Sequence, residues 1–391
     1  MKEETRLVST GRPGVDQADD RRALPVNTPV ERASTILFPT YSDYLEGVRS
    51  VRYGRFGTST HRAFEASVTA LEGGHSTRIA PSGLLAVTAA ILAFVKAGDH
   101  VLVTDSAYDP TRTFAEKFLR RFGVDVEYYA PTLGAGVAAL IRDRTKVIFA
   151  ETPGSLTFEV QDIPALARVA KDAGAALIVD NTWSGGLFLK PIALGAAISV
   201  QAGTKYLAGH SDVMIGTITS ADARVASLVY DSLSQIGSAA SPDDAYLAHR
   251  GLRTLAVRMR RCGETGLALA RWLEGRPDVK RVMHPALESF PGHAIWKRDF
   301  TGASGLFSFV MPPMPEAAIA AFFDALSLFG IGFSWGGYES LAVRVRPERA
   351  RTITPWTEPG AVVRIHAGLE DVDDLRADLG RAFAAMARAA P

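Results

Sequence analysis

The chain has 391 residues, of which 47% are hydrophobic and 22% are charged, and its formal net charge is +1. A charge this close to zero gives no bulk electrostatic reason to expect nucleic acid or an anionic membrane as a partner. The single cysteine, Cys262, excludes an intramolecular disulfide and a cysteine metal cluster, and the length favours two domains.

The first residues, as far as Pro25, are polar and rich in arginine and aspartate. They contain no apolar segment of the kind that a secretory signal requires. No apolar run elsewhere approaches ~20 residues, so a transmembrane helix is not supported. We therefore expect a cytoplasmic enzyme whose N-terminal arm is disordered or lies on a partner subunit.

From Thr60 onward, short apolar strands alternate with amphipathic helices. Helices are predicted at residues 62–72, 84–94, 111–121 and 163–173. Strands are predicted at residues 100–104, 124–129, 146–151, 176–180 and 198–201. Continuous apolar strands of this kind are typical of a mostly parallel sheet covered by helices on both faces. The pattern predicts an α/β domain over residues 60–242.

After residue 242 the alternation becomes less strict. Residues 245–273 are mostly helical, and another helix is predicted at 315–329. Strands are predicted at residues 279–282, 305–310 and 361–366. This order predicts a smaller α+β domain over residues 243–391.

Functional side chains are expected beyond the carboxyl ends of the strands, where open α/β sheets bind ligands. Ser82, Gly83 and Leu84 open a helix, so their main-chain N–H groups could bind a phosphate. Gly83 would let the phosphate approach closely. A simple N-cap followed by a turn glycine is the alternative.

Three further residues follow predicted strands. Tyr108 could stack on a flat heteroaromatic ring, or could be a loop tyrosine at a sheet edge. Asp180 could pair with a protonated pyridine nitrogen; the alternatives are an N-cap and a metal ligand, although no second carboxylate stands at ligand spacing. Lys205 is flanked by small and apolar residues, so it is an amine nucleophile or a buried ion-pair lysine, and Thr204 could add a hydroxyl to the phosphate.

Other motifs carry less weight. Residues 134–139 imitate a dinucleotide fingerprint, but the turn before them is too long, so an NAD-dependent oxidoreductase is a weak rival. The eight histidines form no HxxxH or HExxH pair, and no metal site is expected. Cys262 is expected to be inert.

Asp180-Asn-Thr-Trp183 is followed, 25 residues after Asp180, by Lys205 within Gln201–Asp212. This combination resembles the Cys/Met-metabolism family of pyridoxal-phosphate enzymes of fold type I, over about residues 35–388. The resemblance implies pyridoxal 5'-phosphate as cofactor, carried by Lys205, and an aminotransferase-like large domain. It also implies a homotetramer in which the arm, residues 1–59, contacts a neighbouring subunit.

The resemblance assigns roles to further residues. Tyr53 and Arg55 match a segment that reaches the cofactor phosphate of the neighbouring subunit, and Tyr53 also faces substrate. Ser334 and Trp335 match the substrate-binding segment. Arg364 matches the arginine that holds the substrate α-carboxylate, which a planar guanidinium binds through two hydrogen bonds.

Within the family, Trp183 and Trp335 resemble the versions found in bacterial cystathionine β-lyases. The implied reaction is β-elimination on L-cystathionine to homocysteine, pyruvate and ammonia, with cysteine or cystine as further substrates. Lys205 would act as general base, and Lys205 or Tyr108 would protonate the leaving thiolate. The alternatives on the same scaffold are γ-lyase, cysteine desulfhydrase and γ-replacement synthase or sulfhydrylase activities. Ala202 stands where many γ-type members carry serine, so the phosphate has one hydroxyl fewer. Residues 227–242 match the family poorly, which leaves substrate preference open.

Overall fold

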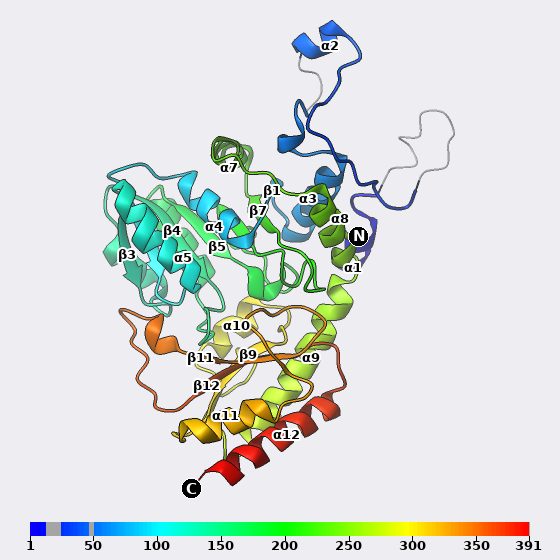
Figure 1. Ribbon diagram of the computed structural model, residues 1–391. Coiled ribbons are helices and arrows are strands. Elements are labelled where there is room, and N and C mark those ends of the chain that lie inside the picture. Colours follow the sequence, from blue (N-terminus) through cyan, green and yellow to red (C-terminus); the bar gives the residue numbers. More distant parts are fainter. Residues whose placement is uncertain (13–24, 47–50, 391) are drawn as a thin grey trace.

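A computed structural model describes residues 1–12, 25–46 and 51–390 (Figure 1). Its larger part is a seven-stranded sheet in the order β1-β7-β6-β5-β4-β2-β3. The strands are β1 (Ser76–Ala80), β2 (His100–Thr104), β3 (Asp125–Tyr129), β4 (Thr145–Glu151), β5 (Ala176–Asp180), β6 (Ile198–Gln201) and β7 (Gly216–Ser220). Strand β7 pairs antiparallel with β1 and β6, and the other pairings are parallel. The predicted α/β class is confirmed.

Side chains of the central strands alternate between the two faces of this sheet, as the two-residue period of a strand requires. Val101 and Val103 pack with α4 (Gly83–Leu92) and α7 (Ala223–Gln235), whereas Leu102 between them packs with α6 (Ile163–Asp172) on the opposite face. Both faces are therefore covered by helices, which leaves the loops at the strand ends to form a site.

The helix predicted at residues 111–121 is irregular. It begins as α5 (Asp109–Phe114), continues as a π-helical turn, η3 (Ala115–Leu119), and ends in a 3₁₀ turn, η4 (Arg120–Phe122). The fingerprint-like residues 134–139 lie in another 3₁₀ helix, η5 (Gly134–Leu140), whose Val137 is buried against α6. That segment is part of the helical layer and does not line the cavity described below.

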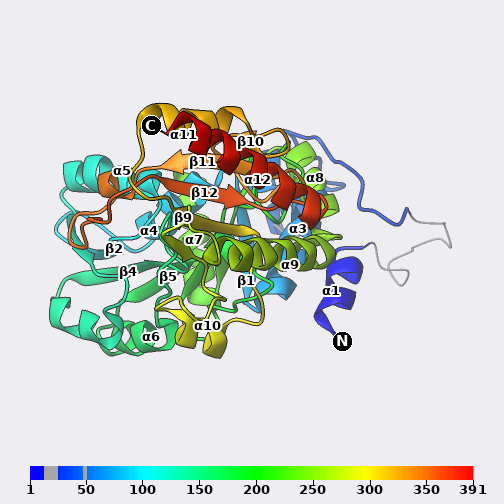
Figure 2. The ribbon, with the colours of Figure 1, turned by 90° about the horizontal axis from the view of Figure 1, so that it is seen from below.

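The second sheet has five strands in the order β10-β11-β12-β9-β8. They are β8 (Arg281–Met283), β9 (Leu306–Val310), β10 (Gly330–Ile331), β11 (Leu341–Val345) and β12 (Val362–His366). Helices α11 (Glu316–Asp324) and α12 (Val372–Ala389) pack together on the side of this sheet that faces away from the first one (Figures 1 and 2). Strands β10 and β11 and helix α12 were absent from the predicted elements.

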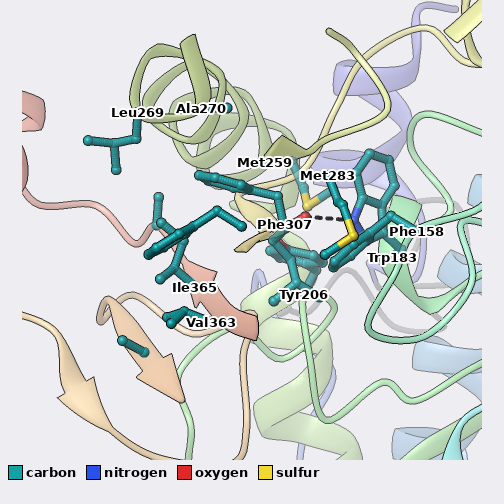
Figure 3. Packing of buried hydrophobic residues seen from close by; sticks show 14 of the residues in the cluster. Phe158, Trp183, Tyr206, Met259, Leu269, Ala270, Met283, Phe307, Val363 and Ile365 are labelled. Atoms are coloured by element: carbon teal, nitrogen blue, oxygen red, sulfur yellow. Dashed lines mark hydrogen bonds between the residues drawn. The ribbon is translucent and has the colours of Figure 1, made fainter. Parts of the chain in front are cut away.

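One hydrophobic cluster joins the two sheets (Figure 3). Met259 and Leu269 come from α9 (Leu255–Glu274), and Phe307 comes from β9. They pack in the same cluster as Trp183 and Tyr206 of the larger part. Because this junction is packed like a core, residues of both parts hold a defined arrangement where they meet.

The beginning of the chain differs from the expected arm. Helix α1 (Glu3–Ser9) lies on its own chain, with Leu7 only 3% exposed in the shared cluster. Arg253 donates hydrogen bonds to the carbonyl oxygens of Leu7 and Thr10, at 2.8 and 2.7 Å. The apolar side chain of Leu7 and this arginine dock α1, so the alternative of a disordered arm is wrong for these residues. Contact of the arm with a partner subunit stays a prediction.

Residues 35–46, which include the short helix α2 (Tyr41–Glu46), project from the body (Figure 1). Leu37, Tyr41 and Leu45 are 86%, 74% and 62% exposed. Residues 13–24 and 47–50 of the predicted arm lie outside the described residues. No helix in the described part of the chain is long and apolar enough to span a membrane.

Candidate active site

A cavity of about 390 Å³ lies between the carboxyl ends of the parallel strands and the second sheet. Strand β4 ends in Glu151 and β5 ends in Asp180, and both acids line the cavity. Leu306 of β9 and Arg364 of β12 line it from the second sheet. Nine of the predicted site residues line this cavity: Ser82, Gly83, Leu84, Tyr108, Asp180, Thr204, Lys205, Trp335 and Arg364.

The start of α4 forms one end of the cavity. Ser82 caps the helix, since its hydroxyl accepts a hydrogen bond from Leu85 N at 3.1 Å. A Cβ atom added to Gly83 would lie 2.5 Å from the Ala202 Cβ, so no side chain fits there. The close approach of Ala202 is therefore a second reason for glycine, beside the access to phosphate that was predicted. The main-chain N–H groups at this helix start suit an anionic group.

Thr204 lies beside this helix start. Its hydroxyl donates to Ile215 O at 3.1 Å and accepts from Ile215 N at 2.9 Å. The hydroxyl is therefore engaged by the main chain of its own loop. Its contact with a phosphate stays a prediction.

Asp180 lies at the floor of the cavity and is 9% exposed. Burial raises its pKa, and hydrogen bonds from the hydroxyl and the main-chain N–H of Thr182 act in the opposite direction. A buried carboxylate of this kind is stabilised by a cation at contact distance. A protonated pyridine nitrogen would supply that cation.

Tyr108 stands at the N-terminus of α5, and its side chain is 48% exposed at the cavity. Burial and the negative charge of Glu151 raise its pKa, while Arg364 opposes them. The hydroxyl is therefore protonated at neutral pH and can donate a hydrogen bond or a proton. Its half-exposed ring is free to cover a flat ligand.

Lys205 points into the cavity from the loop after β6. Its Nζ donates to Ser334 Oγ at 2.8 Å and lies 5.4 Å from the centre of the Trp335 ring. Burial, followed by the positive charge of Arg364, lowers the pKa of Lys205 to about 8. An amine with this pKa has a substantial neutral fraction near neutral pH, which a nucleophile requires.

This lowered pKa predicts how the cofactor-free protein would react with pyridoxal phosphate, the cofactor that the resemblance implies, because only the neutral amine reacts. The rate constant should rise about tenfold per pH unit well below pH 8 and level off above it. Stopped-flow absorbance across this range measures it, with Nα-acetyl-lysine as the control amine. Arg364→Leu should raise the pH of the midpoint, because it removes a positive charge that lowers the pKa of Lys205. A wild-type rate constant that is independent of pH would contradict the assignment.

Arg364 lies on β12, directly opposite Ser308 of β9. Its Nη2 donates to Phe333 O at 2.7 Å, which leaves the other side of the guanidinium toward the cavity. Two residues further, His366 Nε2 lies 3.1 Å from Gly337 O. Strand β12 thus carries Arg364 and is also hydrogen-bonded to the segment that contains Ser334.

The two tryptophans line the same cavity in different ways. Trp183 is 4% exposed and donates from Nε1 to Leu306 O at 3.0 Å, so its polar atom is used by the second sheet. Trp335 packs against Tyr206, the residue after Lys205, at 5.6 Å between ring centres. Of the two rings, that of Trp335 lies beside the Lys205 amine and shields one side of it.

Two predicted site residues lie elsewhere. Tyr53 is 46% exposed and Arg55 donates to Ser234 O at 3.0 Å, and neither lines the cavity of its own chain. One residue was missed. Glu151 ends an apolar strand, as Asp180 does, and the two residues are paired at the ends of neighbouring strands. This position beside Asp180 is the signal that could have identified Glu151.

These residues fit pyridoxal phosphate. A helix start suits the phosphate, a buried acid suits the ring nitrogen, a half-exposed tyrosine suits the ring, and an amine with a lowered pKa suits the aldehyde. Arg364 remains for a carboxylate of the substrate.

Comparisons with known proteins point to the same cofactor. The family model for "Cys/Met metabolism PLP-dependent enzyme" matches residues 7–384. A cystathionine beta-lyase of Salmonella typhimurium is 44% identical over 97% of this chain and 98% of its own length. An L-alanine/L-glutamate racemase of Wolbachia pipientis is 40% identical over 99% of this chain and 98% of its own length.

A solved structure has the same fold. The cystathionine gamma-lyase of Lactobacillus plantarum, solved in complex with L-serine, superposes with a TM-score of 0.90 at 28% identity, covering 99% of this chain and 100% of that one. The match of the family model extends over most of the sequence and includes every residue that lines the cavity. The chain belongs to the family of pyridoxal-phosphate-dependent enzymes of cysteine and methionine metabolism.

Proposed function

We propose that this chain is a carbon–sulfur lyase that carries out β-elimination on L-cystathionine, giving homocysteine, pyruvate and ammonia. The observation that supports this most directly is the position of the Lys205 amine, which donates to Ser334 Oγ beside the Trp335 ring, with Arg364 in the same cavity. The Salmonella relative, which carries this activity in its name, adds support. Cysteine and cystine contain the same Cα–Cβ–S unit and are proposed as further substrates.

Several residues would hold the cofactor. Asp180 would accept a hydrogen bond from the protonated ring nitrogen, Tyr108 would cover one face of the ring, and the start of α4 would bind the phosphate. Lys205 would carry the group until substrate arrives. When bound, pyridoxal phosphate supplies an electron sink for the charge that develops at Cα.

The chain's own side chains then orient the substrate and move its protons. Arg364 holds the α-carboxylate, which fixes the substrate Cα relative to Lys205. Lys205 Nζ, with a pKa of about 8, removes the Cα proton, and Ser334 Oγ holds the amine in position. The Tyr108 hydroxyl or the Lys205 ammonium donates a proton to the leaving sulfur.

The products decide between this reaction and its rivals. Purified protein incubated with L-cystathionine should yield pyruvate and homocysteine, identified by mass spectrometry. The γ-lyase structure motivates one rival, for which 2-oxobutyrate and cysteine would form instead. The Wolbachia relative motivates another, for which L-alanine would give D-alanine on a chiral column without any keto acid. Either result in the absence of pyruvate would overturn the proposal.

We also propose that the active enzyme is a homotetramer whose sites are shared between subunits. Tyr53 and Arg55 lie outside their own cavity, and residues 35–46 project with exposed apolar side chains. The poorly matching stretch 227–242 lies with Arg55, which contacts Ser234, so it would face the partner's site. Activity per subunit should fall on dilution as the mass measured by light scattering falls; activity retained by a monomer would contradict this assembly.

A further inference from the structure

Glu151 is the one acid besides Asp180 that lines the cavity among the described residues, and the mechanism above leaves it unused. It ends β4, and its Cα is paired in register with that of Asp180 at the end of β5. Its carboxyl group accepts a hydrogen bond from the main-chain N–H of Tyr108, with 2.6 Å between N and Oε2. Glu151 thus connects β4, which ends beside Asp180, to Tyr108, which supplies the aromatic ring.

The Tyr108 ring depends on its main chain for its direction. The side chain is 48% exposed, so packing restrains it only in part. Residue 108 adopts φ −50° and ψ 134° immediately before α5, where the chain turns from a loop into a helix. A ring at such a position is held over a ligand only if the turn itself is held.

Glu151 is itself well anchored. Its carbonyl oxygen accepts from Gln161 Nε2 at 2.7 Å, and the Gln161 side chain in turn accepts from the Tyr129 hydroxyl at 2.9 Å. Both Gln161 and Tyr129 are buried. The carboxyl group that holds Tyr108 therefore extends from a fixed main chain.

We propose that Glu151 is a positioning residue of the cofactor site, whose carboxyl oxygen holds the main chain of Tyr108 so that the tyrosine ring covers the cofactor. This inference deepens the proposed function and rests on it, because it requires that the cavity is the cofactor site. Burial, followed by the charge of Asp180, raises the pKa of Glu151 well above its usual range. An amide, which keeps the acceptor oxygen without a charge, should therefore replace this carboxyl group well.

Binding of pyridoxal phosphate to the cofactor-free full-length protein tests the proposal. Glu151→Ala should weaken binding at least about tenfold, as removal of a supporting contact does, whereas Glu151→Gln should stay within about threefold of the wild type. Visible circular dichroism of the bound cofactor should change in the alanine variant and be retained in the glutamine variant. Glu116→Gln, a surface acid paired with Arg120 on the π-helical segment, is the matched control.

A double-mutant cycle separates a role through Tyr108 from a general structural role. In a Tyr108→Ala background, Glu151→Ala should change the affinity by less than about threefold, because the ring that it positions is gone. Additive losses, or wild-type affinity in Glu151→Ala, would overturn the proposal. If Glu151→Ala loses its native far-ultraviolet spectrum, Glu151→Met, which keeps the length but lacks the acceptor, takes its place. Cofactor affinity does not depend on which product forms, so the failure of the β-lyase assay leaves this result interpretable.

Discussion

Replacement of Lys205 by alanine should reduce turnover of L-cystathionine by about 10³-fold or more, because both the amine that carries the cofactor and the base that removes the Cα proton are lost. The visible absorbance of the covalently bound cofactor should disappear as well. The structure supports both losses, since the Lys205 amine projects into the cavity and has a pKa lowered to about 8. Keto-acid release and the visible spectrum measure the two effects separately.

A surface lysine provides the control for this substitution. Lys171, in the last turn of α6, is exposed and lies outside the cavity, so Lys171→Ala should keep both the spectrum and the rate. Thermal unfolding of the two cofactor-free variants should be similar, which separates chemistry from folding. Turnover by Lys205→Ala above a few per cent of the wild-type rate would remove Lys205 from the mechanism.

Replacement of Arg364 by lysine should lower kcat/KM for L-cystathionine by about 30-fold, corresponding to about 2 kcal/mol for a charge-assisted hydrogen bond that lysine cannot reproduce. The positive charge remains, but the planar pair of N–H groups for the carboxylate is gone. Arg364→Leu should lose more, because the cation is removed too. Most of the effect of lysine should fall on KM, since the carboxylate is bound before and during the reaction.

Arg344 offers a matched control on the same sheet. It lies on β11, next to the strand of Arg364, and pairs with Glu316 at the surface, where its contribution should be small. Arg344→Lys should leave kcat/KM unchanged. If Arg364→Lys retained the wild-type KM, another group would have to bind the α-carboxylate.

The sequence predicts the centre of the large sheet better than its edge. Strands at residues 100–104, 176–180 and 198–201 were predicted at their observed limits, because each is a short apolar segment buried on both faces. Strands β1 and β7 escaped prediction because three of the five residues in each are polar. The buried hydroxyls of Thr77 and Thr219 lie 2.9 Å apart, which satisfies them only after the strands have paired.

The predicted site shows the same division. Asp180 and Lys205 could be placed because Asp180 ends an apolar strand and Lys205 follows one, and a parallel sheet brings such strand ends together. Glu151 ends a strand as well, but its contact with Tyr108 depends on a turn 43 residues earlier in the chain. The docking of α1 was missed because its one buried side chain, Leu7, gives no helical pattern of its own.

The antiparallel edge of the large sheet also constrains the order in which the molecule can form during synthesis. Strand β1 pairs with β7, so that Ser76 lies opposite Ser220, and β7 is the strand that connects β1 to β6 and the rest of the sheet. On the ribosome, β1 emerges long before its partner and waits, unpaired, until the intervening residues have been made. A nascent chain shorter than about 220 residues therefore exposes a strand edge that a chaperone could cover.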